Sequence, residues 1–381
     1  MEVVYQGFDG LDFSLQGQIS PALEQELEAA KLEAKKQHGA VVLDWKGAKL
    51  HVKDSGARGG YSYLVSTGDF GATWFFKKPN VRDPWGVRVS CNSFLLATYG
   101  FAEARNKIYE LLDLLEVKLK SRGESIGRID YAVDILAPEF ELVPERFVMH
   151  SNANRADHWE PLEISTNGKS GRTSSVTVGK MPGQQVIVYD KRAEVISKHK
   201  HAWWVIWNAA MQQKGLPPLD HDDPDKSRIW RVEYRTGKKF LKDRWNIRSW
   251  ADVANRYGDL VSATAQSIRY TNPTSDSNRS RWPDSTLWLK AKAALDTDLF
   301  EMRSYAEPCL IKQVHQHEHS ELLQRQMTGL LTSKAAINGI DADSLSEFAR
   351  LTGNEMATAI QSAPEDFAEK LKKAEDRYFV Y

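Results

Sequence analysis

The chain has 381 residues, and its 51 lysines and arginines balance its 51 aspartates and glutamates, so net charge indicates no class of partner. Hydrophobic residues make up 41% and charged residues 27%, which is typical of a globular protein and excludes a disordered chain. The length predicts two or three domains.

Cysteine content and the N-terminal sequence indicate a cytosolic protein. Cys91 and Cys309 are too few for a disulfide framework and too far apart for a cysteine zinc site. The first residues lack the cationic and apolar regions of a secretory signal. The longest apolar stretch, residues 202–211, falls short of the roughly 18 residues of a membrane span. We therefore expect a cytoplasmic chain with no membrane partner.

Alternating apolar and polar residues predict a β-rich N-terminal region that two helices interrupt. The alternation runs through residues 2–18 and 40–92. Residues 20–39 begin with Ser-Pro, continue with strong helix formers and end at a glycine, which predicts the first helix. Residues 101–120 place leucines and an isoleucine on one helical stripe, which predicts the second.

The middle of the chain predicts further strands, at residues 128–135, 160–166, 173–180, 185–191 and 228–235. Their predicted connections are a short helix at 144–150, a hairpin turn at 181–183, a helix at 192–213 and a loop at 215–225.

Beyond Gly237 the pattern is helical to the end, apart from a polar loop at residues 271–283. We predict an α+β fold with a central, largely antiparallel sheet, flanked by helices and followed by a helical C-terminal region. The predicted domains are an α+β domain at residues 1–250 and a mainly helical region at residues 251–381.

Two of the predicted strands each carry ionisable side chains on one face, because successive side chains of a strand point to opposite sides. The residues on these faces are Arg128, Asp130, Asp134, Arg231, Glu233 and Arg235. Together with Glu194, the carboxylates are candidate ligands of a hard divalent cation if the strands share a sheet. The alternative is that the carboxylates pair with the arginines; a close carboxylate cluster without any cation would repel itself.

Tyr189 is a candidate nucleophile. It shares a strand face with Lys191, and Glu194 follows at the start of the next helix. A phenol has a pKa near 10, so it attacks phosphorus well only if a cation or base eases the loss of its proton. Lys191 or a bound metal would supply that help. The alternative is that Tyr189 is an ordinary half-buried strand residue.

A basic segment follows the second ionisable strand. Residues 225–248 contain nine cations and three anions, which predicts a phosphate-binding surface next to the candidate site. The residues expected to contact nucleic acid are Arg128, Arg231, Arg235, Lys238, Lys239, Lys242 and Arg244. The alternative is a solvated charged face.

Other chemistries receive less support from the sequence. His315 and His319 lie one helical turn apart, but no third metal ligand is evident, which favours a solvated helix face. The chain has no GxxxxGK[ST] loop, GxGxxG turn or nucleophile elbow.

Three segments together resemble the replication initiation factor family of rolling-circle plasmids and filamentous phages. Its members are also called trans-acting Rep proteins, and conjugative relaxases are related to them. The segments are RIDYAVDI at 128–135, RTSSVTVGKMPGQQVIVYDKRAE at 172–194 and RIWRVEYR at 228–235, the last followed by the basic segment. NRSRWP at 278–283 is similar to a later part of members from Gram-negative bacteria.

The resemblance implies an endonuclease that nicks one DNA strand at a replication origin. In this family a tyrosine becomes linked to the 5′ phosphate, and the strand is later rejoined. The tyrosine and lysine of the Y-[DN]-K-x-x-E motif fall on Tyr189 and Lys191. The metal-binding acids fall on Asp130, Asp134, Glu194 and Glu233, with Mg²⁺ or Mn²⁺ as cofactor. Residues 180–188 lack the serine and arginine that many relatives carry there.

The implied partner is single-stranded or hairpin origin DNA, and a host helicase and a second copy of the chain are further expected partners. The implied domain roles are nicking and origin binding for residues 1–250, and DNA binding or oligomerisation for residues 251–381.

Four alternative functions stay open from the sequence. They are a non-catalytic origin-binding or copy-control protein, a conjugative relaxase, a tyrosine recombinase and a scaffold protein. The recombinase has little support, because the chain has no His-x-x-Arg motif. A scaffold leaves the charged strand faces unexplained.

Overall fold

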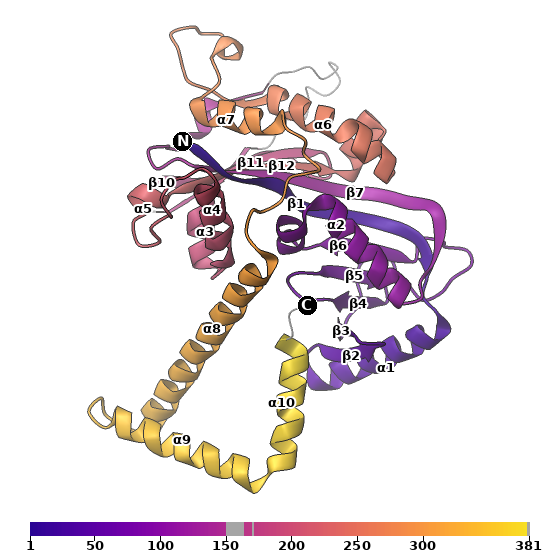
Figure 1. The fold of residues 1–381 in the computed structure, drawn as a ribbon, viewed down its shortest axis with the longest axis vertical. Coiled ribbons are helices and arrows are strands. Elements are labelled where there is room, and N and C mark those ends of the chain that lie inside the picture. The colour runs from indigo at the N-terminus through magenta and orange to yellow at the C-terminus, as the bar shows by residue number, and fades with distance from the viewer. Residues whose placement is uncertain (150–163, 170, 379–381) are drawn as a thin grey trace. The chain divides into compact units, whose positions relative to one another are not determined.

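The computed structural model describes residues 1–149, 164–169 and 171–378, which form two compact units (Figure 1). The first unit is Met1–Ile311 and the second is Lys312–Tyr381. The first contains the sheet and the candidate site, and the second contains only helices among its described residues.

An antiparallel sheet of eleven strands organises the first unit, in the order β2-β3-β4-β5-β6-β1-β7-β12-β11-β10-β9. The first six strands in chain order are β1 (Glu2–Gln18), β2 (Val41–Trp45), β3 (Ala48–Val52), β4 (Tyr63–Ser66), β5 (Ala72–Phe76) and β6 (Val87–Cys91). The other five are β7 (Lys118–Leu136), β9 (Ile164–Lys169), β10 (Arg172–Gly179), β11 (Gln184–Asp190) and β12 (Ile229–Gly237). A separate two-stranded ribbon pairs β8 (Phe147–Met149) with β13 (Ile268–Tyr270).

Helices connect and cover these strands. Those of the first unit are α1 (Pro21–Gln37), α2 (Ser93–Leu114), α3 (Lys191–Ser197), α4 (Ala202–Gln213), α5 (Pro224–Ser227), α6 (Trp250–Ser267) and α7 (Thr286–Leu295). Three short helical turns are η1 (Pro144–Arg146), η3 (Phe240–Arg244) and η4 (Arg279–Arg281). The remaining helices are α8 (Pro308–Ile337), α9 (Leu345–Ser362) and α10 (Pro364–Tyr378). None of the helices in the described part of the chain is both long and apolar enough to cross a membrane.

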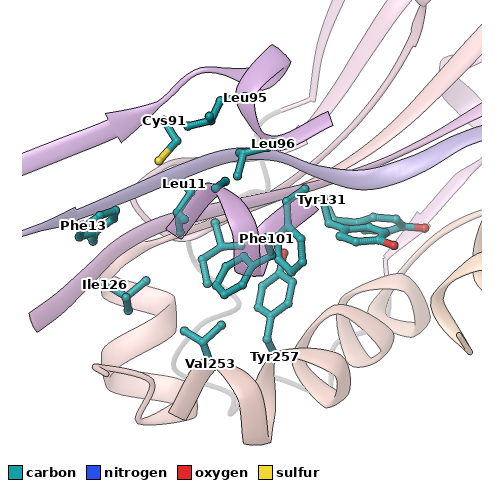
Figure 2. Packing of buried hydrophobic residues seen from close by; sticks show 14 of the residues in the cluster. Leu11, Phe13, Cys91, Leu95, Leu96, Phe101, Ile126, Tyr131, Val253 and Tyr257 are labelled. Atoms are coloured by element: carbon teal, nitrogen blue, oxygen red, sulfur yellow. The ribbon is translucent and has the colours of Figure 1, made fainter. Parts of the chain in front are cut away.

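The sheet has one apolar face, which forms the main core. Leu11 and Phe13 of β1 are buried on it. Figure 2 shows Phe101 of α2 and Tyr257 of α6 close to Tyr131 of β7 on this face. Because side chains alternate along a strand, the residues between these apolar positions point to the opposite face, which carries the candidate site.

The predicted α+β class and antiparallel sheet are confirmed, and several element boundaries differ from the prediction. Residues 118–120, predicted as the end of a helix, pair with β1 as the start of β7. The short helix predicted at 144–150 is a single 3₁₀ turn followed by β8, because Phe147 and Val148 are buried. Residues 268–270, predicted as part of a helix, form β13, because they pair with β8. The residues 160–163 of a predicted strand lie outside the described residues.

The compact units divide after residue 311, whereas the predicted domains divide at residue 250. The physical reason is that α6 and α7 belong to the core of the sheet: Val253, Tyr257, Leu287 and Trp288 are all fully buried in it. The functional roles assigned to the two predicted domains stay predictions.

We expect Phe8→Ala to lower the free energy of unfolding by about 3–5 kcal/mol, the range for a buried aromatic truncated in a packed core. The Phe8 ring is 1% exposed and lies 4.7–5.6 Å from the rings of Phe101, Tyr131, Tyr257 and Phe300, centroid to centroid. Urea denaturation measures the change. The fully exposed Val81→Ala is the control, and an equal effect of the two substitutions would contradict this description of the core.

Candidate functional site

Strand register brings the ionisable residues of three strands into rows on one side of the sheet, here called the polar face. In the first row, Asp134 of β7 pairs with Arg231 of β12, and Arg231 pairs with Tyr189 of β11. Directly paired residues point to the same side of a sheet, so these three side chains are neighbours. The condition for these side chains to converge, that the ionisable strands share one sheet, is therefore met.

Two further rows lie along the same strands. Glu233 pairs with Ile187 in the second row, and Arg235 pairs with Asp130 in the third. Glu233 is thus the diagonal neighbour of Tyr189 across β11 and β12, within reach of a long side chain.

Arg231 is the centre of a buried ion-pair cluster. Its guanidinium donates to Asp134 through Nε (2.5 Å) and Nη2 (2.9 Å), and to Asp9 through Nη1 (2.6 Å). Arg231 and Asp134 have no exposed side-chain surface. Although burial disfavours the charged guanidinium, the two carboxylates keep the pKa of Arg231 well above its ordinary value. The cluster is therefore a fixed charged element inside the protein.

Helix α4 covers this end of the polar face with tryptophans. Trp207 donates its Nε1–H to Asp134 Oδ2 at 2.8 Å. The ring of Trp203 lies 4.4 Å from the Arg231 guanidinium carbon and 4.8 Å from Lys191 Nζ, centroid to atom, as in cation–π contacts. Figure 1 shows α3 and α4 on the opposite side of β11 and β12 from α6 and α7.

Tyr189 is half-buried between this cluster and the rest of the polar face. Burial raises the pKa of its phenol well above the ordinary value, the Arg231 guanidinium opposes that rise, and the Glu233 carboxylate adds to it. The ammonium of Lys191 lies 5.7 Å from the centre of the Tyr189 ring. The phenol is therefore protonated in the free protein at neutral pH.

Lys191 and Glu194 come from the first turns of α3, which Asp190 caps by accepting a hydrogen bond from the backbone of Ala193 at 2.8 Å. Lys191 is buried and pairs with Glu194 at 2.5 Å. Burial, together with the Arg231 charge, lowers the pKa of Lys191. Burial would raise the pKa of Glu194, but the ammonium groups of Lys191, Lys200 and Lys198 together outweigh it and hold that pKa below the usual range.

The two remaining predicted metal ligands also pair with arginines of their own strands. Asp130 pairs with Arg128 at 2.5 Å, and Glu233 pairs with Arg235 at 2.6 Å. Burial raises the pKa of Asp130 to about 7; Arg128 opposes that shift and the Glu233 carboxylate reinforces it. Asp130 is thus a carboxyl group that titrates near neutral pH.

These contacts do not fit a preformed divalent-cation site built from Asp130, Asp134, Glu194 and Glu233. Each carboxylate already pairs with an arginine or lysine, and both oxygens of Asp134 accept hydrogen bonds from Arg231. Within residues 1–149, 164–169 and 171–378, no three His, Cys, Asp or Glu side chains converge as metal ligands would, and the histidine alternative in α8 gains no support either.

The predicted nucleic-acid contacts divide into three groups by their exposure. Lys238, Lys239, Lys242 and Arg244 are exposed at the end of β12 and in η3, as a phosphate-binding surface requires. Arg231 is fully buried and held by carboxylates, so it is not free to contact a phosphate directly. Arg128 and Arg235 are half-buried on the part of the polar face that lies beyond the Arg231 cluster.

Three residues of the site were not predicted from the sequence: Asp9, Trp203 and Trp207. Asp9 stands where the register of β1 against β7 shifts between Phe8 and Gly10, and such a bulge re-aims a side chain. The tryptophans form part of an unusually aromatic helix, AWWVIWNAAMQQ, which was the available signal.

Comparison with known proteins gives a likeness in structure but none in sequence. No family profile matches the chain, and no curated protein matches it in sequence. A rolling circle replication initiator protein from Geobacillus stearothermophilus is similar to it over 78% of this chain and 97% of that chain, with a TM-score of 0.38 and 14% identity. A likeness of this size does not assign a function, so the function is inferred from the site itself.

We expect Arg231→Met to lower the free energy of unfolding by about 3–5 kcal/mol, because it leaves the buried carboxylate of Asp134 and the partly buried one of Asp9 without their cation. Arg88→Met is the matched control: it also breaks a cross-strand pair with an aspartate, Asp12 at 3.0 Å, but the Arg88 side chain is 39% exposed. The control should cost less than about 1 kcal/mol. Urea denaturation of both variants measures the two losses of unfolding free energy, and losses of similar size would contradict a buried ion-pair cluster.

Asp130 should make stability fall as pH rises from about 4 to about 7. Its pKa is raised in the folded state, so over this interval the native protein holds a proton that the unfolded chain has lost. The contribution is fully present below the unfolded pKa and is lost by pH 7, with an upper limit of about 4 kcal/mol for about three pKa units. Asp130→Asn should flatten the profile, and the exposed Asp54→Asn should not. If the unfolding free energies of Asp130→Asn and wild type changed with pH in the same way, Asp130 would not be the source of the pH dependence.

The DNA-free protein should gain no stability from millimolar Mg²⁺ or Mn²⁺, because the four carboxylates are already paired. A ligand that binds only the folded state raises the melting temperature, so thermal denaturation with the chloride salts or with EDTA tests this. A rise of several degrees that EDTA reverses would contradict the paired arrangement.

Proposed function

We propose that the chain is a replication initiator of the rolling-circle type, which nicks one DNA strand through Tyr189 and later rejoins it. The observation that carries the proposal is the position of Tyr189: its strand neighbour is the buried Arg231, its diagonal neighbour is Glu233, and the Lys191 ammonium lies over its ring. The resemblance of the three sequence segments supports the same reading, since all three lie on adjacent strands of one sheet.

The proposed step exchanges one phosphodiester for another. The Tyr189 oxygen forms a bond to the phosphorus while the bond from phosphorus to the 3′ oxygen breaks, leaving a 5′-phosphotyrosine and a free 3′ hydroxyl. The phenolic proton passes to Glu233 and from there to solvent water, and the departing 3′ oxygen takes up a proton from water, so atoms and charge balance without ATP. Lys191 and Arg231 supply fixed positive charge beside the developing phenolate.

The substrate is proposed to be single-stranded or hairpin origin DNA. An extended, unpaired strand can lie along the β-strands and bring a phosphate to the half-buried Tyr189, whereas stiff duplex DNA cannot follow that surface closely. The exposed lysines at the end of β12 would hold its phosphates, so binding should weaken with salt.

Tyr189→Phe should abolish the covalent DNA adduct and leave DNA affinity within about twofold, because it removes one hydroxyl that affinity does not need. The assay is a denaturing gel with labelled single-stranded origin candidates, followed by fluorescence anisotropy for binding. Tyr305→Phe, at a tyrosine that is 64% exposed, is the control and should form adduct as wild type does. An adduct that survives in Tyr189→Phe would refute this nucleophile.

The cation requirement that the resemblance implies, Mg²⁺ or Mn²⁺, is tested in the same assay with EDTA. Adduct formation that persists in EDTA would remove the cation from the proposal; loss with EDTA and recovery with either metal would retain it.

The second candidate function is a non-catalytic origin-binding or copy-control protein. Two observations favour it: the pKa of Tyr189 is raised, and the neighbouring carboxylates are engaged in ion pairs. On this reading wild type binds DNA and forms no adduct at any metal concentration. A conjugative relaxase would form the same adduct, so its DNA substrate, a transfer origin, distinguishes it.

A further inference from the structure

A cavity lies beside residues 124–126 in the middle of β7, away from the Tyr189 row near the end of that strand. It has a volume of about 420 Å³ and is lined by Ser14, Tyr61, Trp85, Glu124, Ser125, Ile126, Lys238, Lys242, Ile247 and Arg248. Ligand pockets measure roughly 300–1,000 Å³, so the cavity can hold a small molecule or one unit of a polymer. The N-terminal strands contribute to it, although the sequence motifs lie elsewhere.

The cavity combines aromatic rings with unpaired positive charge. Lys238 and Lys242 are exposed, and no carboxylate in the described part of the chain forms an ion pair with either of them. Arg248 is also exposed; its side chain donates from Nε to the nearby Asn246 side chain at 3.2 Å, and its backbone N–H donates to Asp252 at 3.1 Å. Three cations against the single carboxylate of Glu124 leave a surface that attracts a phosphate.

The two aromatic residues differ in how they are held. Tyr61 packs against two other side chains: its ring centroid lies 5.8 Å from that of Phe75 and 5.0 Å from Lys77 Nζ. Trp85 is half-buried, and among the described residues its ring has no aromatic or cationic partner. An indole at the wall of a charged cavity is a stacking surface for a planar ring.

We propose that this cavity binds one unpaired nucleotide of single-stranded DNA, with the base against Trp85 and Tyr61 and its phosphates on Lys238, Lys242 and Arg248. Glu124 repels phosphate and accepts hydrogen bonds from amino groups, so it faces the base edge and favours cytosine over thymine, which has no amino group.

The position of the cavity connects it to the proposed nicking site, on whose function this inference rests. Ser125, which lines the cavity, lies nine residues before Asp134 on β7, and at about 3.3 Å per residue the two are about 30 Å apart. The half-buried Arg128 lies on the polar face between them. Single-strand-binding folds cover roughly 4–16 nucleotides, a length that spans this distance.

The test measures anisotropy of labelled oligo(dC) and oligo(dT) with the full chain. Trp85→Ala should weaken oligo(dC) binding by about five- to a hundredfold, the effect of losing one stacked base. Trp85→Phe should restore most of the affinity, which separates stacking from misfolding. Lys238→Gln should weaken binding and reduce its salt dependence, whereas Lys35→Gln, exposed on α1, should do neither.

Three results would overturn the proposal: wild-type affinity in Trp85→Ala, equal loss in Trp85→Phe and Trp85→Ala, or equal binding of oligo(dC) and oligo(dT). Failure of the nicking function is visible separately. In that case wild type gives no covalent adduct while the Trp85 and Lys238 variants still bind oligo(dC) more weakly.

Discussion

The structure of the site depends on a guanidinium enclosed by protein. Arg231 has no exposed surface, and its three hydrogen bonds to Asp134 and Asp9 join three strands that are distant in sequence. An enclosed ion pair is stable only when its geometry satisfies nearly every donor and acceptor. The strands β1, β7 and β12 are therefore held in one register, and the same contacts fix the position of Tyr189 relative to Glu233.

Helix α4 and the cluster depend on each other. Trp207 donates a hydrogen bond to the Asp134 carboxylate, and the Trp203 ring lies against both Arg231 and Lys191. Aromatic rings exclude water, which strengthens every charge interaction beneath them. The polar face thus has a closed end, where the charges are fixed, and an open part in which Arg128 and Arg235 are half-buried.

Most of the sheet and the composition of the polar face could be predicted from the sequence. The alternation of apolar and ionisable residues in segments such as RIDYAVDI indicates which side chains lie on the same face of the sheet. The pairing of strands could not, since it depends on contacts between distant segments. The helix predicted to reach residue 120 ends at Leu114 because its last residues pair with β1 instead.

Pairing also decides what each charged side chain does. A carboxylate two residues from an arginine on a strand can bind a cation or that arginine, and the sequence does not distinguish them. In the structure, Asp130 forms an ion pair with Arg128, and Glu233 forms one with Arg235. Asp9 was missed because a bulge in β1 breaks the alternation on which the prediction relied.

The length of β7 has a consequence for how the chain tolerates change. This strand of 19 residues contributes Ile129, Tyr131 and Val133 to the core and Asp130 and Asp134 to the polar face. A slip by a single residue would exchange the two sets, exposing the apolar side chains and driving carboxylates into the core. Insertions and deletions between residues 128 and 136 should therefore be forbidden in descendants of this sequence, even where individual substitutions are accepted.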